Sequence, residues 1–213
     1  MDIVLNDTEV RVLGSLIEKE MTTPEYYPLS LNSLTIACNQ KTNRNPVVSY
    51  DQDVVAQNIS SLQNKGLALK TQTVGSRVAK YLHTVLDKFD LSKQELSVLC
   101  EFMLRGPQTL GEVRTHAERM FPSENLEEVE ETLQRLIDYE PPLAVKLPRE
   151  TGRKDCRHTH LFSGGIAHDF HPELAAPPVT VHQRITILEE ETAKIRSELE
   201  ELKQALSEFK SQF

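Results

Sequence analysis

Four polar side chains between residues 57 and 64 occur at helical spacing and are of types that can read DNA bases. The sequence predicts a helix over about 49–65, with Val55, Ile59 and Leu62 facing a core. At about 100° per residue, the opposite face then carries a mostly uncharged, hydrogen-bonding stripe. Glutamine and asparagine can pair bidentately with adenine edges. The base-facing candidates are Gln57, Ser60, Ser61 and Asn64. An ordinary solvated or protein-contacting face is the alternative interpretation.

Basic residues that could hold DNA phosphates lie in a polar loop and in two predicted hairpin turns. Lysine and arginine supply most of the affinity for the DNA backbone, because their binding releases condensed counterions. The phosphate candidates are Lys41, Arg44, Arg77, Lys80, Arg149, Arg153, Lys154 and Arg157. Hairpin tips and exposed loops can also carry charge for solubility alone, so a role without DNA contact is the alternative interpretation.

One cysteine and two histidines have a pattern that could bind a metal. Cys156, His158 and His160 would share one face of a strand, because strand side chains alternate. Their compact spacing lacks the paired ligands of structural zinc motifs, which favours packing or solvent contact. The sequence contains no phosphate-binding glycine motif, zinc-protease motif or serine-nucleophile motif. We therefore expect no metal, no cofactor, no catalytic residue and no enzymatic activity.

The elements that would position these side chains occur in two copies. The pattern of leucine, glutamate and valine-leucine at 5–13 recurs at 91–99, a shift of 86 residues. The apolar spacing of 55–62 recurs at 129–136. Each copy predicts a capped first helix, a short second helix and a longer third helix, followed by two β-prone runs.

Three helices followed by a β-hairpin is the order of a winged helix-turn-helix. The second helices are predicted at about 30–39 and from Thr109, and the third helices at about 49–65 and 124–139. We expect Ser49 to begin the first of these third helices, with Gln52 in the reciprocal capping position. The β-prone runs are 67–73, 80–86, 144–147 and 158–163.

The predicted fold is mainly α with small β-hairpins, an α+β class with two tandem winged helix-turn-helix domains and a C-terminal coiled-coil helix. The domain boundaries are 1–88 for the first winged helix, 89–170 for the second, 171–178 for a linker and 179–213 for the coiled coil.

The two copies differ in charge where a DNA-reading helix would face outward. Asp53 and the four base-facing candidates share the outward face of the first copy, and their five positions correspond in the second copy to Glu127, Glu131, Gln134, Arg135 and Asp138. The net charge is 0 over residues 1–88 and −6 over residues 89–178. An acidic helix repels a polyanion, so we expect the helix at 124–139 to be solvated or to bind a basic protein partner.

The C-terminal segment has an unbroken heptad pattern. Apolar residues alternate in steps of three and four, and charged residues at the flanking positions are complementary for a parallel pair. The predicted dimerisation residues are Ile185, Leu188, Thr192, Ile195, Leu199, Leu202, Leu206 and Phe209. We expect a homodimer; a helix folded back on its own domains is the alternative.

Composition limits the classes of protein that remain. The chain has 213 residues and a net charge of −8, and it lacks the strongly basic domain that most clearly signals nucleic-acid binding. A helix that spans a bilayer needs about 20 apolar residues, and no segment of the sequence approaches that length. The first five residues show no pattern of a secretory signal, so we expect none. We expect a cytoplasmic protein with three reduced cysteines and no membrane partner.

Several short motifs resemble those of the YceH-like bacterial proteins over roughly residues 5–165. They lie at 11–14, 18–20, 22–24, 26–32, 37–41, 105–109, 147–149, 152–153 and 160–161. The resemblance implies a tandem winged-helix architecture. It implies no catalytic or ligand-binding residue.

The leading hypothesis is a DNA-binding, transcription-regulator-like protein that uses the first winged helix and the basic wing of the second. The alternative is a protein-interaction scaffold built on the same domains, which does not bind DNA. A steep fall of DNA affinity with salt would separate the two.

Overall fold

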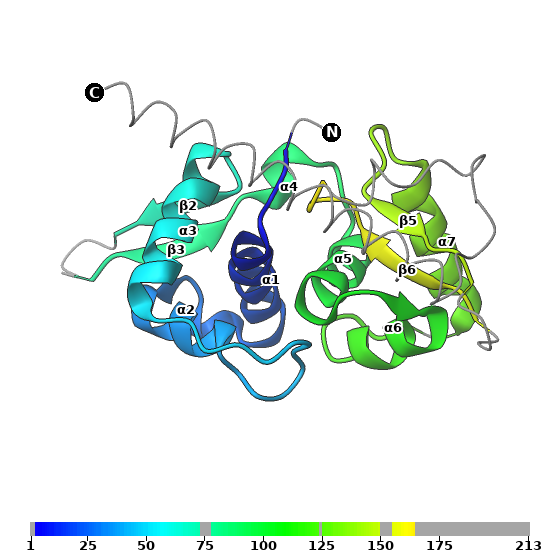
Figure 1. The fold of residues 1–213 in the computed structure, drawn as a ribbon, viewed down its shortest axis with the longest axis horizontal. Coiled ribbons are helices and arrows are strands. Elements are labelled where there is room, and N and C mark those ends of the chain that lie inside the picture. The colour runs from blue at the N-terminus through cyan, green and yellow to red at the C-terminus, as the bar shows by residue number, and fades with distance from the viewer. Residues whose placement is uncertain (1–2, 73–77, 124, 150–154, 165–213) are drawn as a thin grey trace, which may run out of the picture. The chain divides into compact units, whose positions relative to one another are not determined.

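The computed structural model describes residues 3–72, 78–123, 125–149 and 155–164. These residues belong to one compact unit that spans residues 1–169. The fold is mixed, with helices and two small antiparallel sheets (Figure 1). The predicted linker at 171–178 and the predicted coiled coil at 179–213 lie outside the described residues.

The described elements follow the same order twice: a helix, a short strand, two helices and two strands. The first copy consists of α1 (Asp7–Thr22), β1 (Leu29–Ser30), α2 (Leu31–Cys38), α3 (Gln52–Asn64), β2 (Ala68–Thr71) and β3 (Lys80–His83). The second consists of α5 (Lys93–Arg105), β4 (Gln108–Thr109), α6 (Leu110–Ala117), α7 (Leu126–Asp138), β5 (Ala144–Lys146) and β6 (Arg157–His160). A single 3-10 turn, η1 (Pro24–Tyr26), follows α1, and a short helix, α4 (Val85–Lys88), joins the two copies.

Each copy has a three-stranded sheet in which the last strand lies in the middle. The strand orders are β1-β3-β2 and β4-β6-β5, and all pairings are antiparallel. The register places Leu29 opposite Tyr81 in the first sheet and Gln108 opposite His158 in the second. Tyr81 and His158 are therefore equivalent positions of the two copies.

Side-chain caps define where most helices begin. The capping boxes predicted at 6–9, 92–95 and 109–112 are all present. The predicted start of α3 was wrong, because its N-cap is Asp51, whose carboxylate accepts a 2.8 Å hydrogen bond from the Val54 amide. The side chain of Asn39 pairs with both backbone groups of Tyr50, at 2.7 and 2.8 Å. These bonds occupy the backbone that a helix beginning at Ser49 would need.

The segment that follows β3 was also predicted incorrectly. Residues 84–86 were expected to end a strand, but Thr84 is the N-cap of α4, and Val85 and Leu86 begin that helix. Thr84 anchors the turn, since its amide donates to Leu67 O at 2.9 Å and its hydroxyl donates to Gly66 O at 3.0 Å. These bonds lie at the end of the pairing between β2 and β3, where the chain turns toward the second copy.

The two first helices, α1 and α5, pack against each other at the centre of the described unit (Figure 1). Gly14 permits this approach, because a Cβ there would lie 3.0 Å from Met103 Cβ and from Leu104 Cδ2. The Cys100 thiol donates to Gly14 O at 3.3 Å. Gly14 and Cys100 are related by the shift of 86 residues, so equivalent positions of the two copies meet. Both copies consequently share one apolar core.

Candidate nucleic-acid interface

The outward face of α3 carries most of the residues predicted to contact bases. Val55, Ile59 and Leu62 are fully buried, while Gln57, Ser60 and Asn64 are exposed. The Ser60 hydroxyl donates to Ala56 O at 2.9 Å, which leaves its lone pairs free to accept. These three side chains therefore form one accessible hydrogen-bonding stripe.

The structure places Ser61 beside α1 rather than on this stripe. Its side chain is half-buried and hydrogen-bonds the carboxylate of Glu9, to which Lys65 Nζ also donates at 2.6 Å. Burial alone would raise the pKa of Glu9, but the hydrogen bonds from Lys65, Ser61 and the Asn6 backbone lower it overall. This polar cluster fastens the end of α3 to the start of α1, and it engages both Ser61 and Lys65.

The loop between α2 and α3 contains two basic residues in different environments. Lys41 is exposed, as a phosphate contact requires. Arg44 is buried and donates both terminal nitrogens to the carboxylate of Glu18, with a further 2.9 Å bond to Ala37 O. The side chains of Arg44 and Glu18 are completely buried. The structure thus uses Arg44 to anchor the loop, and its guanidinium cannot reach a phosphate in this arrangement.

Further ionic contacts join this anchor to the second copy. Arg119 bridges two buried carboxylates, at 2.5 Å from Glu18 and 3.0 Å from Glu101. Arg105 lies 2.9 Å from Glu101 and donates to Asn43 Oδ1 at 2.6 Å. Burial alone would raise the pKa of Glu18, but the hydrogen bond and charge of Arg44 lower it overall. For Glu101, burial outweighs its two arginines and raises the pKa.

The β2–β3 hairpin of the first copy contributes lysines beside α3. Lys80 is half-buried in β3, where it pairs with Thr71 of β2. Lys70 of β2 is exposed. Lys70 was not among the predicted phosphate contacts, although alternation along the predicted strand would have placed it outward. Arg77 lies outside the described residues.

The second copy presents acidic side chains on the equivalent face. Glu127, Glu130 and Glu131 of α7 are exposed, and with Gln134 they line an open hollow. Arg135 forms an ion pair with Glu95, with 2.9 Å between Arg135 Nε and Glu95 Oε1. This face lacks the positive charge that would favour a phosphate backbone.

The basic segment around the β5–β6 connection is only partly described. Arg149 is exposed, and Arg157 is half-buried in β6. Arg153 and Lys154 lie outside the described residues. The basic residues that remain available for phosphate contact are therefore Lys41, Lys70 and Lys80 in the first copy and Arg149 in the second.

The histidines of β6 are held in largely buried positions. Burial lowers the pKa of His160 to about 4, and its Nδ1 accepts a 3.2 Å bond from the Phe162 amide. Burial and the charge of Lys146 lower the pKa of His158. Cys156 is half-buried. Within the described residues, no three histidine, cysteine or carboxylate side chains converge as metal ligands.

Across the described ranges, no helix combines the length and the apolar character needed to cross a membrane.

Comparison with known proteins identifies the family. Residues 5–153 match the family model described as "Protein of unknown function, DUF480". The chain is 51% identical to a UPF0502 protein of Geotalea uraniireducens and 49% identical to one of Pelobacter propionicus, with all of each chain covered. A UPF0502 protein of Koribacter versatilis is 53% identical over 76% of this chain and 75% of its own length. These matches confirm the family resemblance seen in the motifs, and the chain belongs to the DUF480 family of bacterial proteins.

Proposed function

We propose that each copy is a winged helix-turn-helix and that the first copy binds DNA as part of a transcription regulator. The element order of each copy supports this architecture, since a strand precedes the second helix and a hairpin follows the third. The observation that most supports DNA binding is the outward face of α3. Gln57, Ser60 and Asn64 are exposed there with hydrogen-bonding groups suited to base edges.

The proposed phosphate contacts come from both copies. Lys41 comes from the loop before α3, and Lys70 and Lys80 come from the adjacent wing. Arg149 with Arg153, Lys154 and Arg157 would contribute from the second wing, and Arg77 from the tip of the first. The proposal assigns no catalytic step, places the protein in the cytoplasm, and assigns homodimerisation to residues 179–213.

Capture of sheared genomic DNA by the purified full chain, followed by sequencing, tests the proposal. We expect enrichment of defined sites that is lost in the double variant Gln57→Ala/Asn64→Ala. Each bidentate base contact contributes about 1–3 kcal/mol of discrimination, so loss of two should remove most site preference. The matched control is Glu131→Ala/Asp138→Ala, which changes the equivalent positions of α7 and should retain enrichment. Equal enrichment by both double variants would refute base contact through α3.

The acidic face of α7 favours a second candidate, a scaffold that binds a basic protein. Its exposed glutamates Glu127, Glu130 and Glu131 form a negative surface with an open hollow. Under this alternative, the full chain captures no DNA site. It binds a basic protein partner, and the Glu131→Ala/Asp138→Ala variant loses that binding.

A further inference from the structure

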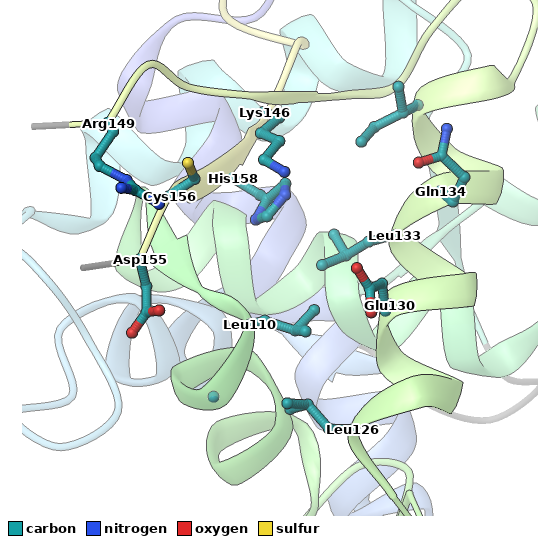
Figure 2. A pocket seen from close by; sticks show the side chains of 12 residues that line it. Leu110, Leu126, Glu130, Leu133, Gln134, Lys146, Arg149, Asp155, Cys156 and His158 are labelled. Carbon is teal, nitrogen blue, oxygen red and sulfur yellow. The ribbon is translucent and has the colours of Figure 1, made fainter. Parts of the chain in front are cut away.

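The second copy contains a groove that the DNA-binding proposal does not use. It lies between α7 and the strands β5 and β6, beside the start of α6, and has a volume of about 400 Å³ (Figure 2). Small-molecule sites in proteins typically fall between roughly 300 and 1,000 Å³. Its apolar wall comes from Leu110, Leu126, Leu133 and Ile137. Leu126 is 42% exposed, so its side chain is accessible at the groove.

Charged side chains of both signs line this groove, and besides Arg149 and Asp155 they include an opposite pair on two different elements. Glu130 projects from α7 and Lys146 from β5 (Figure 2). Among the described residues, neither side chain forms an ion pair within 4.0 Å. A cation and an anion that line one groove without pairing leave room for a ligand that complements both.

His158 also lines the groove, and one of its ring nitrogens is unsatisfied. It is 9% exposed, and its buried Nδ1 has no hydrogen-bond partner in the described part of the chain. Burial and Lys146 lower its pKa while Glu130 opposes them, so both charged groups act on the ring from nearby. A neutral imidazole here offers one hydrogen bond to a ligand without adding charge.

The residues that line this groove differ at the equivalent positions of the first copy. The larger Tyr81 occupies the position of His158 and packs against the apolar core. By the same alignment of the copies, Ala56 stands in place of Glu130 and Asn32 in place of Gly111. A Cβ added at Gly111 meets no atom within 4 Å, so the missing side chain leaves open space in the groove.

We propose that the groove binds a small zwitterion with an apolar group, of the class of apolar α-amino acids and their dipeptides. The ammonium group lies beside Glu130 and the carboxylate beside Lys146. The apolar side chain contacts Leu110, Leu126 and Leu133. Binding at this groove does not require α3 and stands independently of DNA binding.

Titration of the full chain, labelled with ¹³C at leucine and isoleucine methyl groups, tests the ligand class. The probes are L-leucine and L-leucyl-L-leucine, with N-acetyl-L-leucine lacking the ammonium group and L-leucinamide lacking the carboxylate. We expect saturable shifts of Leu110, Leu126, Leu133 and Ile137 with the zwitterions. Each capped compound should bind about tenfold more weakly, because it leaves one charged side chain without its partner.

Charge variants assign each end of the ligand. Glu130→Gln should abolish the preference for L-leucine over N-acetyl-L-leucine, and Lys146→Gln the preference over L-leucinamide. The matched controls are Glu131→Gln on the same helix and Lys70→Gln, the equivalent of Lys146 in the first copy. Both controls should leave the affinities for all four probes unchanged.

A blocking variant gives an outcome that does not depend on charge. Gly111→Leu should fill the groove and eliminate the methyl shifts while the urea midpoint of unfolding stays unchanged, since the added side chain enters open space. The control is Asn32→Leu, at the equivalent position of the first copy. The proposal is overturned if neither zwitterion produces saturable shifts up to about 50 mM, a weak limit for specific binding. It is also overturned if capped and uncapped probes bind equally, or if Gly111→Leu binds them as the unmodified chain does.

Discussion

Lys41 and Arg44 lie three positions apart in one loop, and burial alone separates their roles. Lys41 is exposed and free to meet a phosphate, whereas Arg44 is enclosed with Glu18. A buried arginine keeps its charge only if it is paired and hydrogen-bonded, and Glu18 supplies both. Sequence alone identified the residue types, but it could not identify this pair, whose members are 26 positions apart.

The Glu18–Arg44 pair makes a prediction about stability. Glu18→Gln leaves the buried guanidinium without a countercharge and should lower the free energy of unfolding by about 3 kcal/mol, as other broken buried pairs do. Urea denaturation followed by circular dichroism measures the change. Glu25→Gln, at an exposed site in η1, should stay within about 0.5 kcal/mol of the unmodified chain. An unchanged midpoint for Glu18→Gln would contradict the role assigned to the pair.

His160 makes a prediction about pH. Its pKa is lowered from 6.5 to about 4 in the folded chain, so the unfolded chain takes up a proton first as pH falls. The stability is fully present above about pH 6.5 and is lost progressively toward pH 4. Between pH 7 and 5 this histidine should account for a loss of about 2 kcal/mol.

The variant His160→Gln isolates that contribution. Glutamine can still accept the bond from the Phe162 amide but does not titrate. Urea unfolding at pH 7 and pH 5 should show a smaller loss in the variant by about 2 kcal/mol. The pKa values of His116 and His158 are lowered as well, and their contributions remain in both proteins. An identical pH dependence in the two proteins would show that His160 is accessible to protons.

At the scale of elements, features with a local sequence signal were predicted and features that depend on distant partners were not. The capping boxes at 6–9, 92–95 and 109–112 depend on residues three positions apart, and all three are present. The strands β1 and β4 have two residues each, too few for any periodicity. They form because β3 and β6 supply their hydrogen-bond partners from about 50 residues away.

The corrected start of α3 can be tested directly. Asp51→Ala removes the cap of the Val54 amide and should reduce stability by about 1 kcal/mol. Ser49→Ala should change it by less than about 0.5 kcal/mol, because Ser49 is exposed and precedes the helix. Thermal unfolding of both variants provides the comparison. A larger effect of Ser49→Ala would restore the earlier start.

At the scale of the whole molecule, the two copies are joined through α1 and α5. Gly14 lies where the helices approach most closely, so Gly14→Val must displace Met103 or Leu104. We expect a loss of about 2 kcal/mol from overpacking, measured by urea denaturation. Gly111→Ala is the control, since it enters open space in a helix and should be neutral or slightly stabilising. Equal stability of both variants would mean that the copies do not pack through Gly14.

The proposed homodimer makes a separate prediction for residues 179–213. Deleting this segment should convert the dimer to a monomer in sedimentation equilibrium, because the heptad pattern supplies the proposed seam. The substitutions Leu199→Lys and Leu202→Lys within the full chain should have the same effect. An unchanged mass in both cases would assign self-association, if any, to another surface.

The central claim is that the first copy binds DNA through α3 and the lysines around it. The most direct measurement is the salt dependence of affinity for a captured duplex, followed by fluorescence anisotropy. Phosphate contacts by Lys41, Lys70, Lys80 and Arg149 alone predict a slope of about −3 to −4 in a plot of log affinity against log salt, and the further contacts proposed for Arg77, Arg153, Lys154 and Arg157 would make it steeper. The slope should weaken by about one for Lys41→Ala. Absence of binding near 150 mM salt, or a slope near zero, would contradict the account.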